Sequence, residues 1–261
     1  MKSQFRSFVS LAAVYLGLLF PTFAFGVDPA SSLESAISGK HRSDEHKALD
    51  RELHPKETLE FFGIKPDHKV IEIWPKDGWY TEILAPYLGE SGRLIAAIEP
   101  ANTPERTRLR SRYLDKVADA PDIFGEAAIV TFDPPNSDLR PVGGVDAVIS
   151  AFNVAAWIRN GVVDGAFAAA YRALKSGGVL GIVEYRAAPG SSVEETKRTG
   201  RIEENYIIER AKASGFVLKA RSDIGAKPQD ARAPERATLL FAKPIDAPVP
   251  VDVVRSARND R

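Results

Sequence analysis

One stretch of the sequence decides the fold, and it reads Val70-Ile71-Glu72-Ile73-Trp74-Pro75-Lys76-Asp77-Gly78-Trp79-Tyr80-Thr81-Glu82-Ile83-Leu84. Its first five residues are apolar apart from Glu72, which predicts a buried strand. A turn that contains Pro75 and Gly78 follows, and the apolar spacing beyond it is typical of a helix. A strand, a tight turn and a helix in this order form the ligand-binding corner of many α/β proteins. In that corner the turn is commonly rich in glycine, whereas here it is not.

The rest of the chain repeats this alternation. Apolar runs predict further strands over 93–99, 127–132, 145–150 and 178–184, with helical patterns between them. A helix over 204–214 is then followed by two strands, 216–223 and 237–243, with no helix between them, which favours an antiparallel pair. The expected fold is therefore a doubly wound α/β fold, with a mostly parallel seven-stranded sheet and an antiparallel terminal strand pair.

Composition narrows the class of protein. The 261 residues are 44% hydrophobic, which is enough for the core of one main domain. Lysine and arginine number 35, as do aspartate and glutamate, so no net field favours nucleic acid or another polyanion as a partner. The sequence has no cysteine, which excludes disulfides, thiolate chemistry and cysteine-bound zinc.

The first 26 residues are typical of a secretory signal peptide. Lys2 and Arg6 give a positive start, residues 8–20 are apolar, and small residues follow. An uncleaved membrane anchor is the alternative, but the apolar run is shorter than the roughly 20 residues that span a bilayer, and Pro21 ends it. We expect a periplasmic or secreted protein without a stable membrane anchor after cleavage.

Four segments follow from these patterns. Residues 1–26 are the expected signal peptide, and residues 27–55 form a helical lead-in that begins loosely over 27–41. Residues 56–244 form the α/β domain. The proline and valine spacing and the charged end of residues 245–261 predict a disordered tail.

Two motifs carry a resemblance to a known family. They are Glu72-Ile73-Trp74-Pro75 and Gly78-Trp79-Tyr80-Thr81-Glu82-Ile83-Leu84, together with Arg42, Asp50, Arg51 and the segment His54 to Leu59 in the lead-in. With these motifs the chain resembles the class I S-adenosylmethionine-dependent methyltransferases from about residue 58 to 243, and in particular their exported branch of predicted methyltransferases from bacteria. The resemblance implies a Rossmann-like methyltransferase fold and S-adenosylmethionine as the cofactor.

The resemblance also assigns roles to the turn after the first strand. In this family glycines let the backbone meet the methionine carboxylate, yet Trp74 and Lys76 replace two of them and only Gly78 remains. Glu72 matches the acidic residue that orients the turn or the amino group. A tryptophan predicts an ordinary backbone conformation, because a positive φ costs about 1 kcal/mol or more. Lys76 can compensate by pairing with the carboxylate.

An alternative for this turn stays open. Trp74 can pack on the sheet and Lys76 can be solvated, with no cofactor bound at all. Because the Trp-Pro pair belongs to the branch that the chain resembles, we favour an adapted pocket.

Two acidic residues close the next strands. Glu99 lies about 20 residues after Gly78, the distance at which an acidic residue meets ribose hydroxyls in such folds. Asp133 matches, by the resemblance, a residue near the adenine, while an aspartate before Pro134 and Pro135 is also ordinary turn chemistry.

Candidate acceptor residues follow the fourth and fifth strands. By the resemblance Asn153, Glu184 and Arg186 lie near the acceptor, whereas Ala155 stands where related sequences carry a histidine. An ion pair of Glu184 with Arg186 is the alternative. His46 and Asp50 lie four residues apart on a helix, but no metal motif surrounds them, so no metal is expected.

The sequence thus predicts an S-adenosylmethionine-dependent methyltransferase that acts on a small molecule or an envelope component. The alternative is a non-catalytic exported binding protein that retains the fold. A nicotinamide oxidoreductase is disfavoured, since the turn lacks the Gly-x-Gly-x-x-Gly spacing. Export raises one condition, because the cofactor is made in the cytoplasm and must then be supplied outside.

Overall fold

The computed structural model describes residues 32–245, except 90, 140–143, 223 and 226–234. The predicted signal peptide lies outside the described residues, as does the predicted tail apart from residue 245. Both remain predictions.

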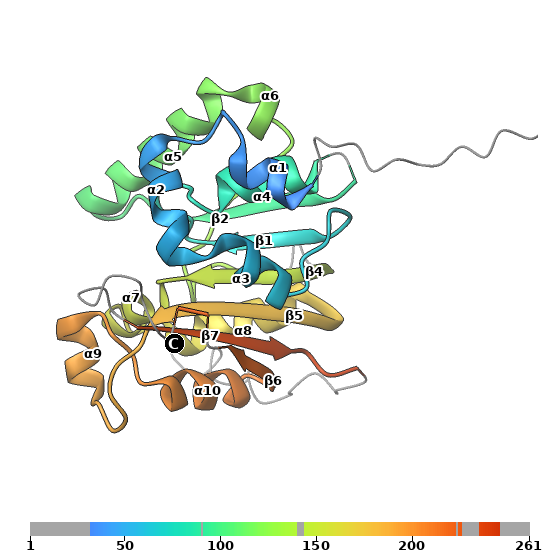
Figure 1. The fold of residues 1–261 in the computed structure, drawn as a ribbon. Coiled ribbons are helices and arrows are strands. Elements are labelled where there is room, and N and C mark those ends of the chain that lie inside the picture. Colours follow the sequence, from blue (N-terminus) through green and yellow to red (C-terminus); the bar gives the residue numbers. More distant parts are fainter. Residues whose placement is uncertain (1–31, 90, 140–143, 223, 226–234, 246–261) are drawn as a thin grey trace, which may run out of the picture.

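A single seven-stranded sheet organises the described chain, and its strand order is β3-β2-β1-β4-β5-β7-β6 (Figure 1). Strands β1 to β5 pair in parallel, while β7 is antiparallel to both β5 and β6. This confirms the predicted mixed sheet with its antiparallel terminal pair. The strands are β1 Lys69–Ile73, β2 Arg93–Ile98, β3 Ala128–Thr131, β4 Val145–Ala151, β5 Leu174–Tyr185, β6 Val217–Ser222 and β7 Arg236–Ala242.

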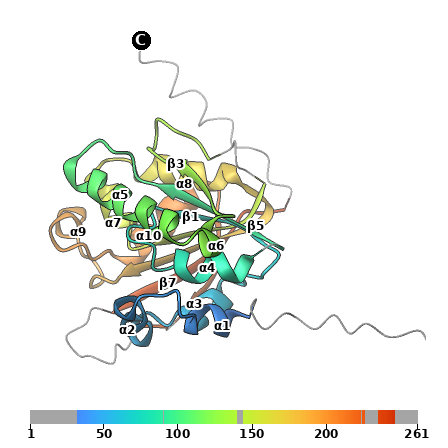
Figure 2. The same cartoon turned by 90° about the horizontal axis from the view of Figure 1, so that it is seen from above.

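Helices cover both faces of the sheet (Figures 1 and 2). One face carries α1 to α6 and the other carries α7 to α10, as in a doubly wound fold. The helices are α1 Leu33–Ser38, α2 Asp44–Leu53, α3 Pro55–Phe61, α4 Thr81–Leu88, α5 Pro104–Asp119, α6 Pro121–Phe124, α7 Val154–Arg159, α8 Val163–Ala173, α9 Val193–Thr199 and α10 Glu204–Ala213.

Alternation along the strands divides the core between these layers. In β1, Val70 joins the cluster under α1, α3 and α4, whereas Ile71 and Ile73 join the cluster under α7, α8 and α10. Successive side chains of a strand point to opposite faces, so a strand buried on both sides must be apolar nearly throughout. This explains the continuous apolar runs of the sequence.

The lead-in is more ordered than the sequence predicts. Residues 32–38 begin with a capped helix, in which the Ser32 hydroxyl accepts a hydrogen bond from the Ser35 amide. Leu33 and Ala36 of this helix are buried. The expectation of a loose segment over 27–41 is therefore wrong for α1, because two buried side chains and a cap hold it against α4.

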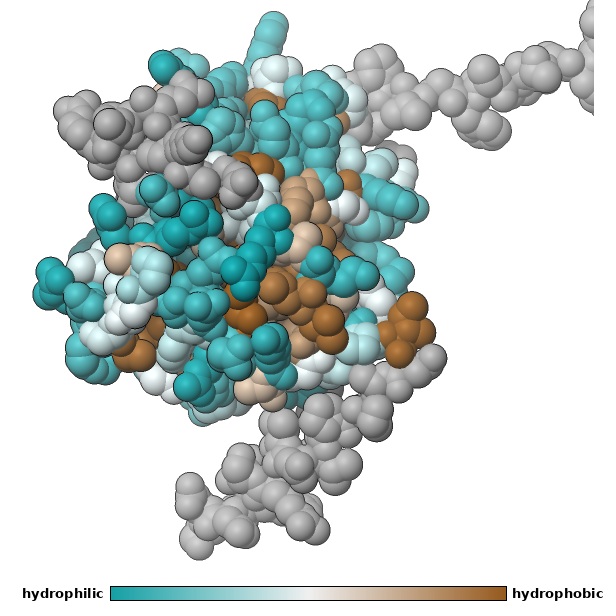
Figure 3. Space-filling model, turned by 60° about the horizontal axis from the view of Figure 1, so that its bottom comes forward, coloured by the Kyte–Doolittle hydropathy of each residue, from teal (hydrophilic) through white to brown (hydrophobic). Residues whose placement is uncertain are grey.

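Figure 3 shows the side of the molecule on which α10 and β6 lie in Figure 1. Hydrophilic side chains cover much of it, and apolar side chains gather near its centre. Val217 on the edge strand β6 is 52% exposed, and Ile245 is 74% exposed.

Within the described part of the chain, no helix combines the length and the apolar character that crossing a membrane requires.

A close contact fixes the end of α3 to the sheet. A Cβ atom placed on Gly181 in the middle of β5 would lie 2.5 Å from Cδ2 of Phe62, at the end of α3. Phe62 is itself buried. The ring of Phe62 thus needs a glycine beneath it.

This contact generates a first prediction. Gly181→Ala should lower the free energy of unfolding by about 1 to 3 kcal/mol, since an overpacked core forces side chains or backbone to shift. Urea unfolding measures the change. Phe62→Leu in the same chain should recover part of it, and a Gly181→Ala protein as stable as wild type would contradict the packing of Phe62 on β5.

Candidate functional site

The candidate site lies outside the carboxyl ends of the central strands. The strand order reverses between β1 and β4, and ligands of open α/β sheets bind at such a switch point. The loop after β1, residues 74–80, lies at this switch point together with the residues that follow β2, β4 and β5, and we refer to this region as the crevice.

The loop has the backbone of a glycine-rich turn without its glycines. Trp74, Lys76 and Gly78 have φ values of 48°, 57° and 84°. Every second residue from 74 to 78 therefore has a left-handed backbone conformation. The prediction that Trp74 keeps an ordinary backbone conformation is wrong. Left-handed conformations cost non-glycine residues about 1 to 3 kcal/mol each and persist only where surrounding contacts impose them.

Contacts from the β4 end impose this conformation. The Asn153 side-chain amide donates to the carbonyl oxygens of Ile73 (2.7 Å) and Trp74 (3.2 Å). The Lys76 ammonium donates to the carbonyl oxygen of Phe152 at 3.0 Å. Asn153 is thus a positioning residue that ties β1 to β4, rather than a group free to face an acceptor.

The indole of Trp74 turns away from solvent and is 4% exposed. Its Nε1 donates to the carbonyl oxygen of Phe132 at 3.0 Å. The guanidinium carbon of Arg106 lies 5.0 Å from the ring centroid, and Trp157 meets the ring edge-on at 6.3 Å between centroids. The indole therefore fills space between the segments that follow β2, β3 and β4.

Lys76 places a cation in the crevice. Its side chain lies over Phe152, with Nζ 5.7 Å from the ring centroid. Burial lowers the pKa of Lys76, and the negative charges of Glu184, Glu99 and Asp77 oppose that shift. Among the residues that the structure describes, only the Phe152 carbonyl hydrogen-bonds to the ammonium, so its other N–H groups can serve a ligand.

Glu72 orients the turn from within the protein. Its carboxylate accepts a hydrogen bond of 2.6 Å from the Thr81 hydroxyl, which lies 3.3 Å from the hydroxyl of Tyr113. Burial raises the pKa of Glu72 to about 7, against the effect of Thr81. The turn-orienting role that the resemblance implies for Glu72 stays a prediction.

Glu99 and Asp133 end neighbouring strands at the same edge. Burial raises the pKa of Glu99, while its own amide, Lys76 and Arg106 oppose that shift. Among the described residues, no side chain donates a hydrogen bond to the Glu99 carboxylate. Its oxygens can therefore accept hydrogen bonds from a ligand. Asp133 is half-buried and accepts from the Asn136 amide at 3.2 Å, which is turn chemistry.

Glu184 and Arg186 do not pair with each other. The Glu184 carboxylate accepts from the Val154 amide at 2.6 Å and so caps α7, and burial raises its pKa to about 7. Arg186 instead pairs with Glu204 at 3.2 Å and Glu235 at 3.6 Å.

Arg186 lines a separate hollow. The hollow measures about 350 Å³ and lies between the end of β5, the start of α10 and the end of β6. Arg221 on its wall pairs with Glu204 at 3.1 Å, so charges of both signs border it. Arg186 is thereby separated from Asn153 and Glu184, the other two residues predicted to face an acceptor.

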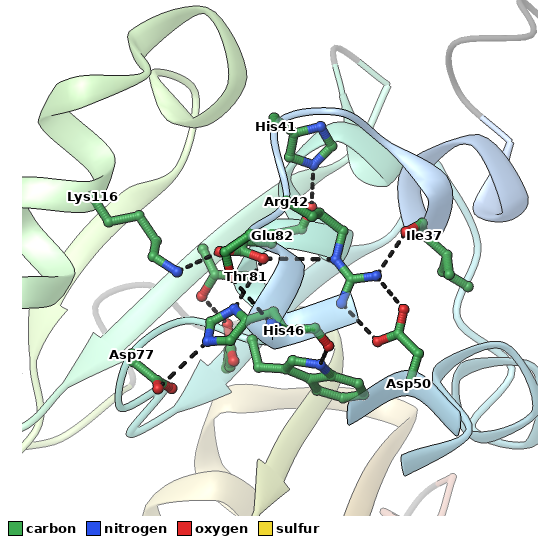
Figure 4. A network of polar contacts seen from close by, with 12 residues as sticks. Ile37, His41, Arg42, His46, Asp50, Asp77, Thr81, Glu82 and Lys116 are labelled. Carbon is green, nitrogen blue, oxygen red and sulfur yellow. Dashed lines mark hydrogen bonds and ion pairs between the residues drawn. The ribbon is translucent and has the colours of Figure 1, made fainter. Parts of the chain in front are cut away.

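A buried polar network joins the lead-in to the loop (Figure 4). Glu82, in the first turn of α4, receives three cations: His46 Nδ1 at 2.9 Å, Arg42 Nε at 3.7 Å, and Lys116. Arg42 also forms a bidentate ion pair with Asp50. Its Nη2 donates to Oδ1 at 2.8 Å, and its Nη1 donates to Oδ2. The lead-in and α5, which are far apart in the sequence, therefore converge on one carboxylate of α4.

His46 links this network to the loop itself. Its Nε2 lies 3.5 Å from Asp77, and hydrogen bonding to Asp77 and then to Glu82 raises the pKa of His46 to about 9. The described residues contain no group of three or more histidine, cysteine, aspartate or glutamate side chains that could hold a metal ion. His46 and Asp50 serve ion pairs instead.

Sequence reasoning missed the role of this network. Glu82 and Arg42 were signals of the resemblance, and a charged residue inside an apolar helix start is a clue to a buried ion pair. Trp157, fully buried beside Trp74, also went unassigned. Neither role follows from spacing, because the partners come from different elements.

The residues fit S-adenosylmethionine on one side of the crevice and obstruct it on the other. The left-handed loop, the Lys76 ammonium and the Glu99 carboxylate present the groups that a carboxylate and a ribose require. The Trp74 indole occupies the side toward β3.

Comparisons place this architecture among known structures. A S-adenosylmethionine-dependent methyltransferase from Aquifex aeolicus is 15% identical, with a TM-score of 0.55 over 75% of this chain and 93% of that one. The [4+2]-cyclase SpnF is 14% identical, with a TM-score of 0.55 over 80% and 85%. The glycopeptide N-methyltransferase MtfA complexed with sinefungin is 13% identical, with a TM-score of 0.52 over 75% and 94%. At these identities the likeness establishes the fold.

No protein family model and no curated protein sequence matches the chain. The fold by itself therefore does not assign an activity to the chain.

The network generates a second prediction. The pKa of His46 is raised from 6.5 to about 9, so its stabilising charge is fully present below pH 6.5 and is lost as the pH rises through 9. At low pH the free energy of unfolding of wild type should be about 1 to 2 kcal/mol higher than that of His46→Gln. This range is smaller than the pKa shift alone would give, because solvent screens the partly exposed ion pairs. Urea unfolding across this range measures the difference.

The comparison is internally controlled. Glu72 and Glu184, whose raised pKa values also reduce stability as the pH rises, are present in both proteins. A difference that stays constant from pH 6 to pH 10 would show that His46 is not ion-paired as described.

Proposed function

We propose that the chain is an S-adenosylmethionine-dependent methyltransferase. The observation that carries this proposal is the loop after β1, where Trp74 and Lys76 are held in left-handed conformations that their side chains disfavour. Such a turn costs stability, and residues with strained backbone conformations cluster at ligand-binding and active sites.

Residues of the loop and its neighbours would hold the cofactor. The Lys76 ammonium would pair with the methionine carboxylate, and the Glu99 carboxylate would accept hydrogen bonds from the ribose hydroxyls. When bound, S-adenosylmethionine supplies an electrophilic methyl group on its sulfonium. Asn153 and Glu184 act as positioning residues, because they fix the loop and α7 through backbone groups.

The acceptor side would be the hollow at Arg186. Its volume of about 350 Å³ lies within the range of small-molecule sites. Arg186, Arg221, Glu203 and Glu204 border it, which suits a small molecule that carries polar or charged groups. Methyl transfer to a good nucleophile needs mainly alignment, so the absence of a histidine at Ala155 does not preclude it.

Location is part of the proposal. Residues 1–26 predict export, which makes an envelope component or a small molecule outside the cytoplasm the acceptor. A cofactor supply in that compartment is then required.

The alternative is a binding protein that keeps the fold without turnover. The buried indole of Trp74 is the observation in its favour. Binding of S-adenosylmethionine without methyl transfer to any extract would support it over the enzyme.

Glu99 generates a third prediction. Glu99→Gln should weaken the binding of S-adenosylhomocysteine by about 1 to 3 kcal/mol, since the carboxylate would hold two hydroxyls. Isothermal titration calorimetry of the full chain measures the affinity. Glu105→Gln removes an equal charge from the exposed first turn of α5 and should leave it unchanged.

Two results would count against the proposal. Equal affinities of wild type and Glu99→Gln would remove Glu99 from the site. An absence of binding to any folded form of the chain would contradict the cofactor itself.

A further inference from the structure

The Trp74 indole lies toward β3, the strand over which the base of a bound cofactor would extend. This follows from the strand order and rests on the proposed function. With the carboxylate at Lys76 and the ribose at Glu99, the base must extend beyond Glu99, away from Lys76. In the order β3-β2-β1, the next strand in that direction is β3.

The indole's neighbours identify the same space. Arg106 belongs to the helix after β2, Phe132 directly follows β3, and Trp157 belongs to the helix after β4. The ring therefore lies where the segments that follow β2, β3 and β4 meet, against the core cluster under α7, α8 and α10. With Trp74 4% exposed, no room is left for a second ring.

The contacts of the indole are also those that suit an adenine ring. The Phe132 carbonyl accepts from the indole N–H, and it could accept equally from an exocyclic amine. The Arg106 guanidinium covers the ring face, and Trp157 meets its edge, as they could with any flat aromatic ring. The side chain is therefore a chemical stand-in for the base.

We propose that Trp74 is an internal competitor for the cofactor, and that the adenine binds only by displacing the indole. The binding-competent state is then a minor population, and the apparent dissociation constant is raised by the inverse of its fraction. Trp74 thereby sets the affinity of the site without contacting the reacting atoms.

Smaller residues at this position provide the test. Trp74→Ala and Trp74→Gly both vacate the space, while only glycine relieves the left-handed backbone at φ 48°. Titration calorimetry with S-adenosylhomocysteine should show binding at least about tenfold tighter in both variants than in wild type. If Trp74→Gly alone bound S-adenosylhomocysteine more tightly, relief of backbone strain would explain the effect. That result would overturn the proposed displacement of the indole.

A second readout follows the wild-type protein and needs a single conservative variant for assignment only. The chain has three tryptophans, so wild type labelled with fluorotryptophan should give three fluorine resonances, with Trp74→Phe assigning one. Saturation with S-adenosylhomocysteine should shift the Trp74 resonance strongly. Trp79, which donates to the His46 carbonyl outside this space, should change little. An unmoved Trp74 resonance in the saturated protein overturns the inference.

The outcomes separate this inference from the proposed function. Equal affinities of wild type, Trp74→Ala and Trp74→Gly would overturn the displacement and leave the cofactor in place. Binding by the variants and not by wild type would support the displacement. If no folded form binds, the proposed function fails, and the inference fails with it.

Discussion

The loop of residues 74–80 depends on a backbone conformation that two of its own residues disfavour. Trp74 and Lys76 are left-handed, and bonds from Asn153 and to Phe152 hold them there. From the other side, Glu82 and Asp77 bind His46 of the lead-in. These contacts, from the end of β4 and from the lead-in, offset a few kilocalories per mole of local strain. Without them the crevice would lose its shape.

This arrangement explains why the lead-in belongs to the site. Breaking a buried ion pair by removing one partner leaves a charge without compensation and costs about 3 to 5 kcal/mol. Glu82 compensates Arg42, His46 and Lys116 at once. The lead-in is thus a structural support of the loop, although it contributes no strand to the sheet.

The sequence predicted the sheet well, since apolar runs such as Val70 to Ile73 report burial on both faces. It did not predict that the Glu72 carboxylate bonds to the Thr81 hydroxyl at the start of α4. It could not predict that the Trp74 indole reaches Phe132, 58 positions away, or that Glu184 caps α7, because such contacts depend on the three-dimensional meeting of separate loops. The backbone of Trp74 was mispredicted for the same reason: tertiary contacts overrode a local preference.

The fold alone leaves the chemistry open, for similar structures include methyltransferases and a [4+2]-cyclase. The central claim is that the loop keeps a cofactor turn whose base position is filled by its own indole. A crystal structure grown at saturating S-adenosylhomocysteine tests it most directly. The account predicts an unchanged loop backbone, adenine beside Phe132 and Arg106, and the indole displaced. A ligand bound elsewhere, with the indole still donating to Phe132, would contradict it.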